Sequence, residues 1–416
     1  MMIYSLLFVT MLVIVGGCGT ELDPHSGTSN LYDDEANFNE DDYKKIITAN
    51  HKLGFKMLKE VRENEEENIF ISPLSLFMAL SMIYHGADGA TKEEIAAALE
   101  TEGIDEEELN QANASLLAML DENSDDIQLN LANSIWLNNK FHFQDEFATL
   151  NRDYFNAEIQ EIDVLENESS KLINDWVDKS TNGKITDIVG DSLNPNLATI
   201  LINAIYFKGN WLYEFDDKLT EAGTFYVNDE VTEDAEFMHL NEELTYMEDD
   251  ELQAVVLPYG EGEMSMTVFL PKEESNLIEL EEKLASEDWS SLRKNFEERE
   301  GTVVFPKFKL EYEITLNEVL ENMGMGLAFD SEKADFSKMI VEDNPIWISQ
   351  VKQKTFIDVN ETGTEASGAT SIEMDTTSAP INIDEPFYME VNRPFFIMIT
   401  DDETNTILFM GSIYHP

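Results

Sequence analysis

Helical sequence patterns gather near the start of the chain, and strand patterns dominate the rest of it. Apolar residues recur at helical spacing over residues 43–61. Ser72 and Pro73 predict the N-cap and first turn of a second helix, which Gly86 ends. A third helix is predicted from a capping box, because Glu94 follows Thr91 at the required spacing.

The strand signals begin after this helical region. Residues 127–135 alternate between apolar and polar, whereas residues 197–207 are apolar almost throughout, which suits a strand buried on both faces. Hairpins are expected around residues 260–262 and 401–405. Helices followed by hairpins indicate an α+β fold rather than alternating βαβ units. No linker divides residues 43–416, so we expect one domain there.

Acidic residues are in large excess along the whole chain. The sequence has 85 Asp and Glu against 26 Lys and Arg, a net charge of -59. Such a surface repels phosphates, so we expect no nucleic-acid partner. Its self-repulsion is strongest at low salt and is screened at molar salt, which predicts a salt-adapted, halophilic protein. An ordinary acidic secreted protein is the alternative.

Cys18 is the only cysteine, and it ends an apolar leader. A single cysteine excludes an intramolecular disulfide and any CxxC site. Residues 1–18 are short for a membrane span and end in small residues, which is typical of a cleaved signal peptide. The leader resembles the lipobox of bacterial lipoproteins, in which the cysteine carries the lipid. We therefore expect an extracytoplasmic, lipid-anchored protein, with plain secretion as the alternative.

The chain then divides into a tether and a folded domain. Residues 19–42 are polar and acidic without periodicity, which predicts a flexible tether. Residues 43–416 form the predicted domain. None of the six histidines lies in HExxH, and nucleophile-elbow, dinucleotide, phosphate-loop and EF-hand motifs are all missing from the sequence. We therefore expect a protein that is not an enzyme and that uses no metal or other cofactor.

Residues 361–380 alternate like a β-strand but have little apolar area. The odd positions are mostly polar, whereas the even positions are small or moderately apolar. The even-numbered residues are Thr364, Ala366, Gly368, Thr370, Ile372, Met374 and Thr376. One face of such a strand suits burial and the other suits water. A flexible acidic surface loop is the alternative interpretation.

Four segments of the chain resemble signatures of the serpin family, in the family's order. They are NIFISPLS (68–75), NAIYFKGNW (203–211), VNETGTEASGAT (359–370) and the stretch from VNRPFFIMI to TILFMGSIYHP (391–416). The resemblance covers the chain from about residue 43 onward. It implies helices around three β-sheets and an exposed reactive-centre loop, which a protease cleaves and which then inserts into a sheet. It also implies a monomeric inhibitor that forms a covalent 1:1 complex with a serine protease.

The resemblance assigns the alternating segment to the reactive-centre loop. Its hinge comprises Glu361, Gly363, Thr364, Glu365, Ala366, Ser367, Gly368, Ala369 and Thr370. Counting from Gly363 as in inhibitory serpins places the cleaved bond between Thr377 and Ser378, with Met374 or Thr376 as alternatives. The inserting face has no proline or charge through Thr376, which favours an inhibitor. The loop also lacks Lys and Arg, which indicates an elastase-like or subtilisin-like target rather than a trypsin-like one.

Two further groups of residues match structural switches of the family. Lys307 and Glu361 match an ion pair at the breach, the place in the sheet where insertion begins. Trp211 matches the aromatic residue beside that ion pair. The alternative interpretation is that Trp211 is only a core residue. A hydrogen-bonded cluster, the shutter, is matched by Ser72, Ser75, Asn203 and Gln353. Gln353 stands where a histidine is usual, so pH sensitivity from that histidine is expected to be missing.

Two other functions remain open at this point. The protein is in one case a non-inhibitory serpin, a surface-anchored binding or scaffold protein whose loop is cleaved only as a substrate. In the other case its acidity serves a cation-binding or adhesive role, and the serpin fold is a scaffold. The proline-free hinge argues against the first function, and the even spread of acidic residues argues against the second.

Overall fold

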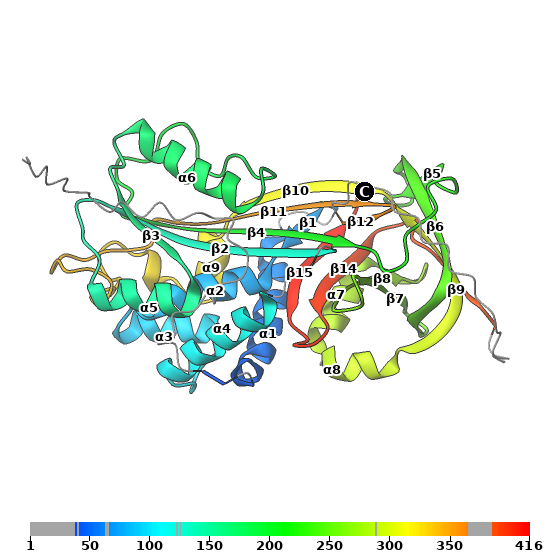
Figure 1. Ribbon diagram of the computed structural model, residues 1–416, viewed down its shortest axis with the longest axis horizontal. Helices are drawn as coiled ribbons and strands as arrows, with labels where there is room; N and C mark the ends of the chain where they lie inside the picture. Colours follow the sequence, from blue (N-terminus) through cyan, green and yellow to red (C-terminus); the bar gives the residue numbers. More distant parts are fainter. Residues whose placement is uncertain are drawn as a thin grey trace, which may run out of the picture. The chain divides into compact units, whose positions relative to one another are not determined.

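The computed structural model describes residues 38–39, 41–62, 66–121, 124, 126–287, 289–364 and 385–416, all within the unit Tyr32–Pro416. Its elements are shown in Figure 1. The helices are α1 (Ile47–Val61), α2 (Pro73–Tyr84), α3 (Gly89–Ala98), α4 (Glu106–Leu120), α5 (Asp145–Phe155), α6 (Asn167–Ser180), α7 (Leu277–Ser286), α8 (Trp289–Leu292) and α9 (Asn317–Asn322), with 3-10 turns η1 (Asp42–Lys45), η2 (Arg293–Asn295) and η3 (Leu327–Phe329).

The first sheet has the strand order β10-β11-β12-β4-β2-β3 among the described residues. Its strands are β2 (Ile127–Asn138), β3 (Glu158–Ile162), β4 (Thr199–Asn210), β10 (Phe308–Thr315), β11 (Gln350–Asn360) and β12 (Gly363–Thr364). As predicted from its apolar sequence, β4 is buried along nearly its whole length. Figure 1 shows why: α6 covers one face of this sheet, and α1, α2 and α4 lie on the other.

The second sheet has the order β1-β15-β14-β8-β7-β6-β9-β13, with β5 paired to β6, in the described part of the chain. Its strands are β1 (Ile69–Ile71), β5 (Glu221–Tyr226), β6 (Thr232–Glu248), β7 (Leu252–Tyr259), β8 (Met264–Pro271), β9 (Glu297–Pro306), β13 (Phe387–Glu390), β14 (Phe395–Asp401) and β15 (Ile407–Ile413). Hydrogen bonds thus connect the described strands into two sheets where three were expected. The reason is the long strand β6, which pairs with β5, β9 and β7 in succession.

The predicted helices and hairpins are present, with one wrong detail. Ser72 caps α2 by accepting a hydrogen bond from Ser75 N at 3.2 Å, and both hairpins form, as β7–β8 and β14–β15. The capping box is wrong because α3 begins at Gly89, with Asp88 as N-cap. Thr91 instead accepts a hydrogen bond from Asp335 N, and Glu94 accepts one from Leu327 N. Tertiary partners have therefore taken both side chains.

Two apolar clusters hold the layers together. The larger one fills the space between the sheets and the N-terminal helices, and α2 is buried on nearly every side within it. The smaller one packs α6 and the residues after it onto β2, β4 and β11. Within the residues that the structure describes, no helix is both long and apolar enough to cross a membrane.

Candidate functional site

The two-residue strand β12 lies between β11 and β4 at one end of the first sheet. It pairs antiparallel with both neighbours: Gly363 and Thr364 face Asn360 and Val359 on one side and Asn210 and Gly209 on the other. Further along, β11 and β4 pair directly, from Gln350↔Ile200 to Lys354↔Ala204. β11 and β4 are therefore separated by one strand at the β12 end of the sheet, and they are direct neighbours from Lys354 to Gln350.

Gly363 fits this position because it has no side chain. A Cβ atom there would lie 2.2 Å from the carbonyl oxygen of Gly209 and 2.7 Å from Cα of Asn210. Both contacts are with backbone, which cannot turn away as a side chain would. Any other residue at this position would force β12 away from β4.

The predicted breach residue Trp211 lies directly beside β12. Its indole Nε1 donates to the Asn360 carbonyl oxygen at 2.9 Å, and its backbone N donates to the Thr362 carbonyl oxygen at 3.0 Å. The indole stacks on the ring of Tyr259, with centroids 4.3 Å apart. Trp211 thus belongs to the core and also holds the start of the loop, so the two interpretations of this residue are compatible.

Tyr259 joins this group from the end of β7. Its Oη lies 2.6 Å from Thr364 Oγ1, and both side chains are buried. Burial raises the pKa of the Tyr259 hydroxyl well above its ordinary value. Tyr259 was not predicted from the sequence, where it signals only the end of a strand. Its position beside Thr364 depends on the packing of two sheets.

The predicted ion pair of the breach is formed. Lys307 Nζ lies 2.9 Å from Glu361 Oε2, and Thr220 Oγ1 donates to Glu361 Oε1 at 2.9 Å. Burial raises the pKa of Glu361, but hydrogen bonds from Lys307, from its own backbone and from Thr220 lower it by more. The pKa of this carboxyl is consequently below its ordinary value, which favours the charged form.

Ser72 and Gln353 of the predicted shutter meet on the opposite side of β11 from α6, whereas the Asn203 side chain donates to Asn133 Oδ1. Gln353 Oε1 accepts from Ser72 N at 3.0 Å, and Gln353 Nε2 donates to the Ser72 carbonyl oxygen at 2.9 Å. The glutamine thus supplies both an acceptor and a donor. Gln353 also faces Asn203 across the β11–β4 pair. Ser75 contributes its backbone N–H rather than its hydroxyl, whose oxygen is buried without a partner among the described residues.

Several predicted residues lie outside the described residues. They are Cys18, the hinge residues Glu365, Ala366, Ser367, Gly368, Ala369 and Thr370, and Met374, Thr376, Thr377 and Ser378 around the predicted cut. The described part of the site is thus the first two residues of the predicted inserting strand and the sheet that holds them.

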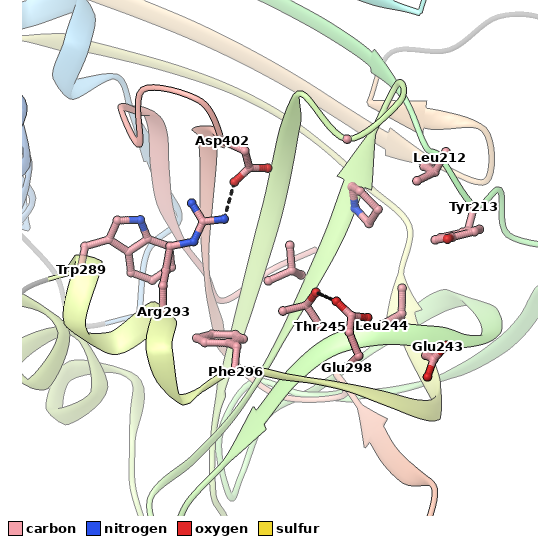
Figure 2. A pocket seen from close by; sticks show the side chains of 13 residues that line it. Leu212, Tyr213, Glu243, Leu244, Thr245, Trp289, Arg293, Phe296, Glu298 and Asp402 are labelled. Carbon is pink, nitrogen blue, oxygen red and sulfur yellow. Dashed lines mark hydrogen bonds and ion pairs between the residues drawn. The ribbon is translucent and has the colours of Figure 1, made fainter. Parts of the chain in front are cut away.

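A cavity of about 340 Å³ lies near this site, lined by β6, β7, α8 and the start of β9. Figure 2 shows Trp289, Arg293 and Phe296 on one side of it and Leu212 and Tyr213 on the other. Arg293 is already paired, through a 2.7 Å hydrogen bond to Asp402. The lining residues include no Ser, Cys or His, and the Thr245 hydroxyl donates to Glu298 Oε1 at 2.6 Å.

Comparisons with known proteins agree with the geometry. The family model "Serpin (serine protease inhibitor)" matches residues 48–416. An uncharacterized serpin-like protein of Thermococcus kodakarensis is 33% identical over 99% of this chain and 98% of its own length. Intracellular coagulation inhibitor 2 of Tachypleus tridentatus is 33% identical over 89% of this chain and 91% of its own.

A solved structure gives the same result. The native state of tengpin, a thermophilic serpin, has a TM-score of 0.81 and 32% identity, covering 91% of this chain and 95% of that one. This likeness covers most of the chain and confirms the α+β fold expected from the sequence. Members of the family are generally protease inhibitors rather than catalytic enzymes. With the family model matching most of its length, this chain belongs to the serpin family.

Proposed function

We propose that this protein is a suicide inhibitor of serine proteases that works by cleavage and insertion of its reactive-centre loop. The position of β12 is the observation that carries the proposal. Gly363 and Thr364 already occupy the first two places of an additional strand between β11 and β4. The chain that follows Thr364 has the alternation that a continuation of this strand requires.

The side chain of Thr364 fixes which face of that strand is buried. It points to Tyr259 on the core side of the sheet, so alternation assigns the later even positions to the same side. Those positions carry Ala366, Gly368 and Thr370, which bring little bulk and no charge into the core. The loop sequence is therefore compatible with both exposure before cleavage and burial after it.

The proposed reaction begins when the protease's serine attacks the carbonyl carbon of Thr377. The bond to Ser378 breaks, the new amino terminus takes a proton, and an ester joins Thr377 to the protease. The freed loop then inserts between β11 and β4 before water hydrolyses the ester. Insertion carries the protease along the sheet, distorts its catalytic site and consumes one inhibitor per protease.

The target class follows from the residues around the cut. Thr377 is small and uncharged, and Glu373 and Asp375 nearby are acidic, so elastase-like or subtilisin-like proteases are the proposed targets. The name of the Tachypleus relative, a coagulation inhibitor, supports inhibition as such. We further propose that a lipid on Cys18 holds the protein outside the cytoplasm, as a monomer.

The test is to mix the full chain with subtilisin, elastase or trypsin at a salt concentration that keeps it folded. The expected result is a covalent complex that survives denaturing electrophoresis with one of the first two proteases, and a released peptide that begins at Ser378. Trypsin serves as the control and is expected to form no complex. Cleavage without a complex by every protease would contradict the proposal and favour the non-inhibitory alternative.

A further inference from the structure

The cavity between β6, β7 and α8 has an apolar part that a ligand could cover. Its volume of about 340 Å³ is within the range of small-molecule sites. The apolar lining comes from Leu244, Val256 and Pro258 on the strands and from the rings of Trp289 and Phe296 on the opposite side. A ligand that fills this space must therefore have an apolar body, and a flat ring suits walls that are themselves partly aromatic.

Carboxylates gather on the strand side of the cavity. β6 and β9 pair antiparallel, with Glu243 opposite Glu300 and Thr245 opposite Glu298, so these four side chains share one face of the pair. All three glutamates are exposed, and within the described residues none of them is paired with a Lys, Arg or His. Like charges directly opposite each other destabilise a strand pair. A bound cation would remove this repulsion.

The one cation in the lining is already neutralised. Arg293 donates to Asp402 Oδ1 at 2.7 Å and to Asn405 Oδ1 at 2.8 Å. An anionic ligand would therefore find no free positive charge there, and it would meet Glu243 and Glu298 on the other wall. The charges of the lining residues favour a ligand that carries a positive charge.

Trp289 supplies a second, independent indication of a ligand. Its side chain lines the cavity and packs edge-to-face on Phe269 and Phe296, with centroids 5.9 and 6.5 Å apart. The residue is only 6% exposed, and its indole Nε1 is buried without a hydrogen-bond partner among the described residues. A buried donor without an acceptor is unfavourable. A ligand oxygen beside the indole would supply that acceptor.

We propose that this cavity binds a small aromatic amine that carries a hydroxyl group at the end remote from its ammonium group. The ammonium group contacts Glu243 and Glu298, the ring lies against the apolar walls, and the hydroxyl oxygen accepts from Trp289 Nε1. Figure 2 shows Trp289 and Glu243 on opposite sides of the lining, as a ligand with two different ends requires. The inference is independent of the proposed function, because no residue of β12 lines the cavity.

The test is calorimetric titration of tyramine into the full chain. It is done at about 1 M NaCl, where the Debye length is about 3 Å, so that attraction to the rest of the acidic surface is suppressed. Three matched probes each lack one feature of tyramine: tyrosol has an alcohol in place of the ammonium group, phenethylamine lacks the hydroxyl, and ethylamine lacks the ring. We expect tyramine to bind about fivefold more tightly than tyrosol or phenethylamine, and ethylamine to show no binding.

Variants at the strand wall test the ammonium contact. Glu298→Gln removes the charge and keeps an oxygen that can accept from Thr245, so it should weaken tyramine binding about threefold and leave tyrosol binding unchanged. Glu297→Gln is the matched control, because it removes the same charge from the neighbouring residue. Residue 297 lies opposite Tyr246, so strand alternation places its side chain on the other face of the pair. We expect Glu297→Gln to stay within about twofold of wild type.

Trp289→Phe tests the other end of the ligand. It retains an aromatic ring and removes the indole N–H, so the preference for tyramine over phenethylamine should disappear. This readout is a ratio of two affinities for the same variant, and a uniform loss of affinity for both probes does not change it. A preference that persists in Trp289→Phe would overturn the assignment of the hydroxyl end.

Three other outcomes would overturn the site itself. One is that wild type does not bind tyramine. Another is that tyramine and tyrosol bind equally well, because the carboxylates then contribute nothing. The third is an equal loss in Glu298→Gln and Glu297→Gln, which would mean that tyramine binds the acidic surface in general. Each of these results leaves the proposed inhibition standing, since that is tested separately by the covalent complex with a protease.

Discussion

Replacing Thr364 with valine tests whether the start of the inserting strand is held by the hydrogen bond between Thr364 and Tyr259. Valine has nearly the shape of threonine, so the backbone of β12 and its pairing with both neighbours are retained. The change removes one atom that matters, the hydroxyl 2.6 Å from Tyr259 Oη. Tyr259 is fully buried, and within the described residues its hydroxyl has Thr364 Oγ1 as its hydrogen-bond partner.

The expected change in the free energy of unfolding follows from the Tyr259 hydroxyl, which Thr364→Val leaves without a hydrogen-bond partner. A buried hydroxyl without a partner costs about 1–3 kcal/mol, so Thr364→Val should lower the free energy of unfolding by that amount. Tyr259→Phe leaves the buried Thr364 hydroxyl without this partner, so its loss is expected in the same range. The double variant replaces both hydroxyls with apolar groups, and it should be more stable than the sum of the two single losses predicts.

The assay is urea unfolding of the intact chain, followed by tryptophan fluorescence through its first transition. The m-value should be the same for all four proteins, so that differences in midpoint report stability. Single losses below about 0.5 kcal/mol would show that the hydroxyl pair contributes little. Strict additivity in the double variant would show that the two residues do not interact, and either result would refute the proposed seating of β12.

Three further predictions concern charge and the two switches. The melting temperature should rise between low and molar NaCl, because salt screens the repulsion among 59 excess negative charges; a flat or falling profile contradicts salt adaptation. The pKa of Glu361 is lowered from 4.5, so its pairing with Lys307 stabilises the fold above that pH and is lost as the pH falls through the lower folded value. The stability advantage of wild type over Lys307→Met should therefore shrink below about pH 4.5, and an advantage that persists at pH 2 would exclude this linkage. Gln353→His should lose stability below about pH 6.5, because a protonated imidazole can no longer accept from Ser72 N, whereas the wild type should show no such loss.

Local sequence patterns predicted the elements better than the contacts between them. The N-cap Ser72 and the largely apolar strand β4 were predicted correctly, because a cap and a two-sided burial pattern are each determined by a few neighbouring residues. The capping box at Thr91 and Glu94 was wrong for the complementary reason. Its spacing is local, but the partners that actually bind these side chains lie more than 200 residues away.

The same difference between local patterns and long-range contacts applies to the candidate site. The pairs Lys307–Glu361 and Ser72–Gln353 were expected only because whole segments resemble a known family; no periodicity links residues so far apart. Tyr259 was missed because nothing in its own segment distinguishes it.

The register of β12 makes a prediction for a residue well beyond the described start of the strand. Continued along both neighbours, it places Thr370 between Asn203 and Gln353, on the core side of the sheet. Asn203 Oδ1 is a buried oxygen that lacks a hydrogen-bond donor among the described residues, and the Thr370 hydroxyl would supply one.

Thr370→Val should therefore leave the intact protein unchanged and reduce the gain in melting temperature on loop cleavage. Thr376→Val is the matched control, because the same register carries residue 376 past the first residues of β4 and β11. Equal gains for wild type and both variants would mean that the cleaved loop does not enter in the register that β12 begins. A stability loss in intact Thr370→Val would mean that this hydroxyl already acts before cleavage, and the inserted-strand assignment of Thr370 would have to be abandoned.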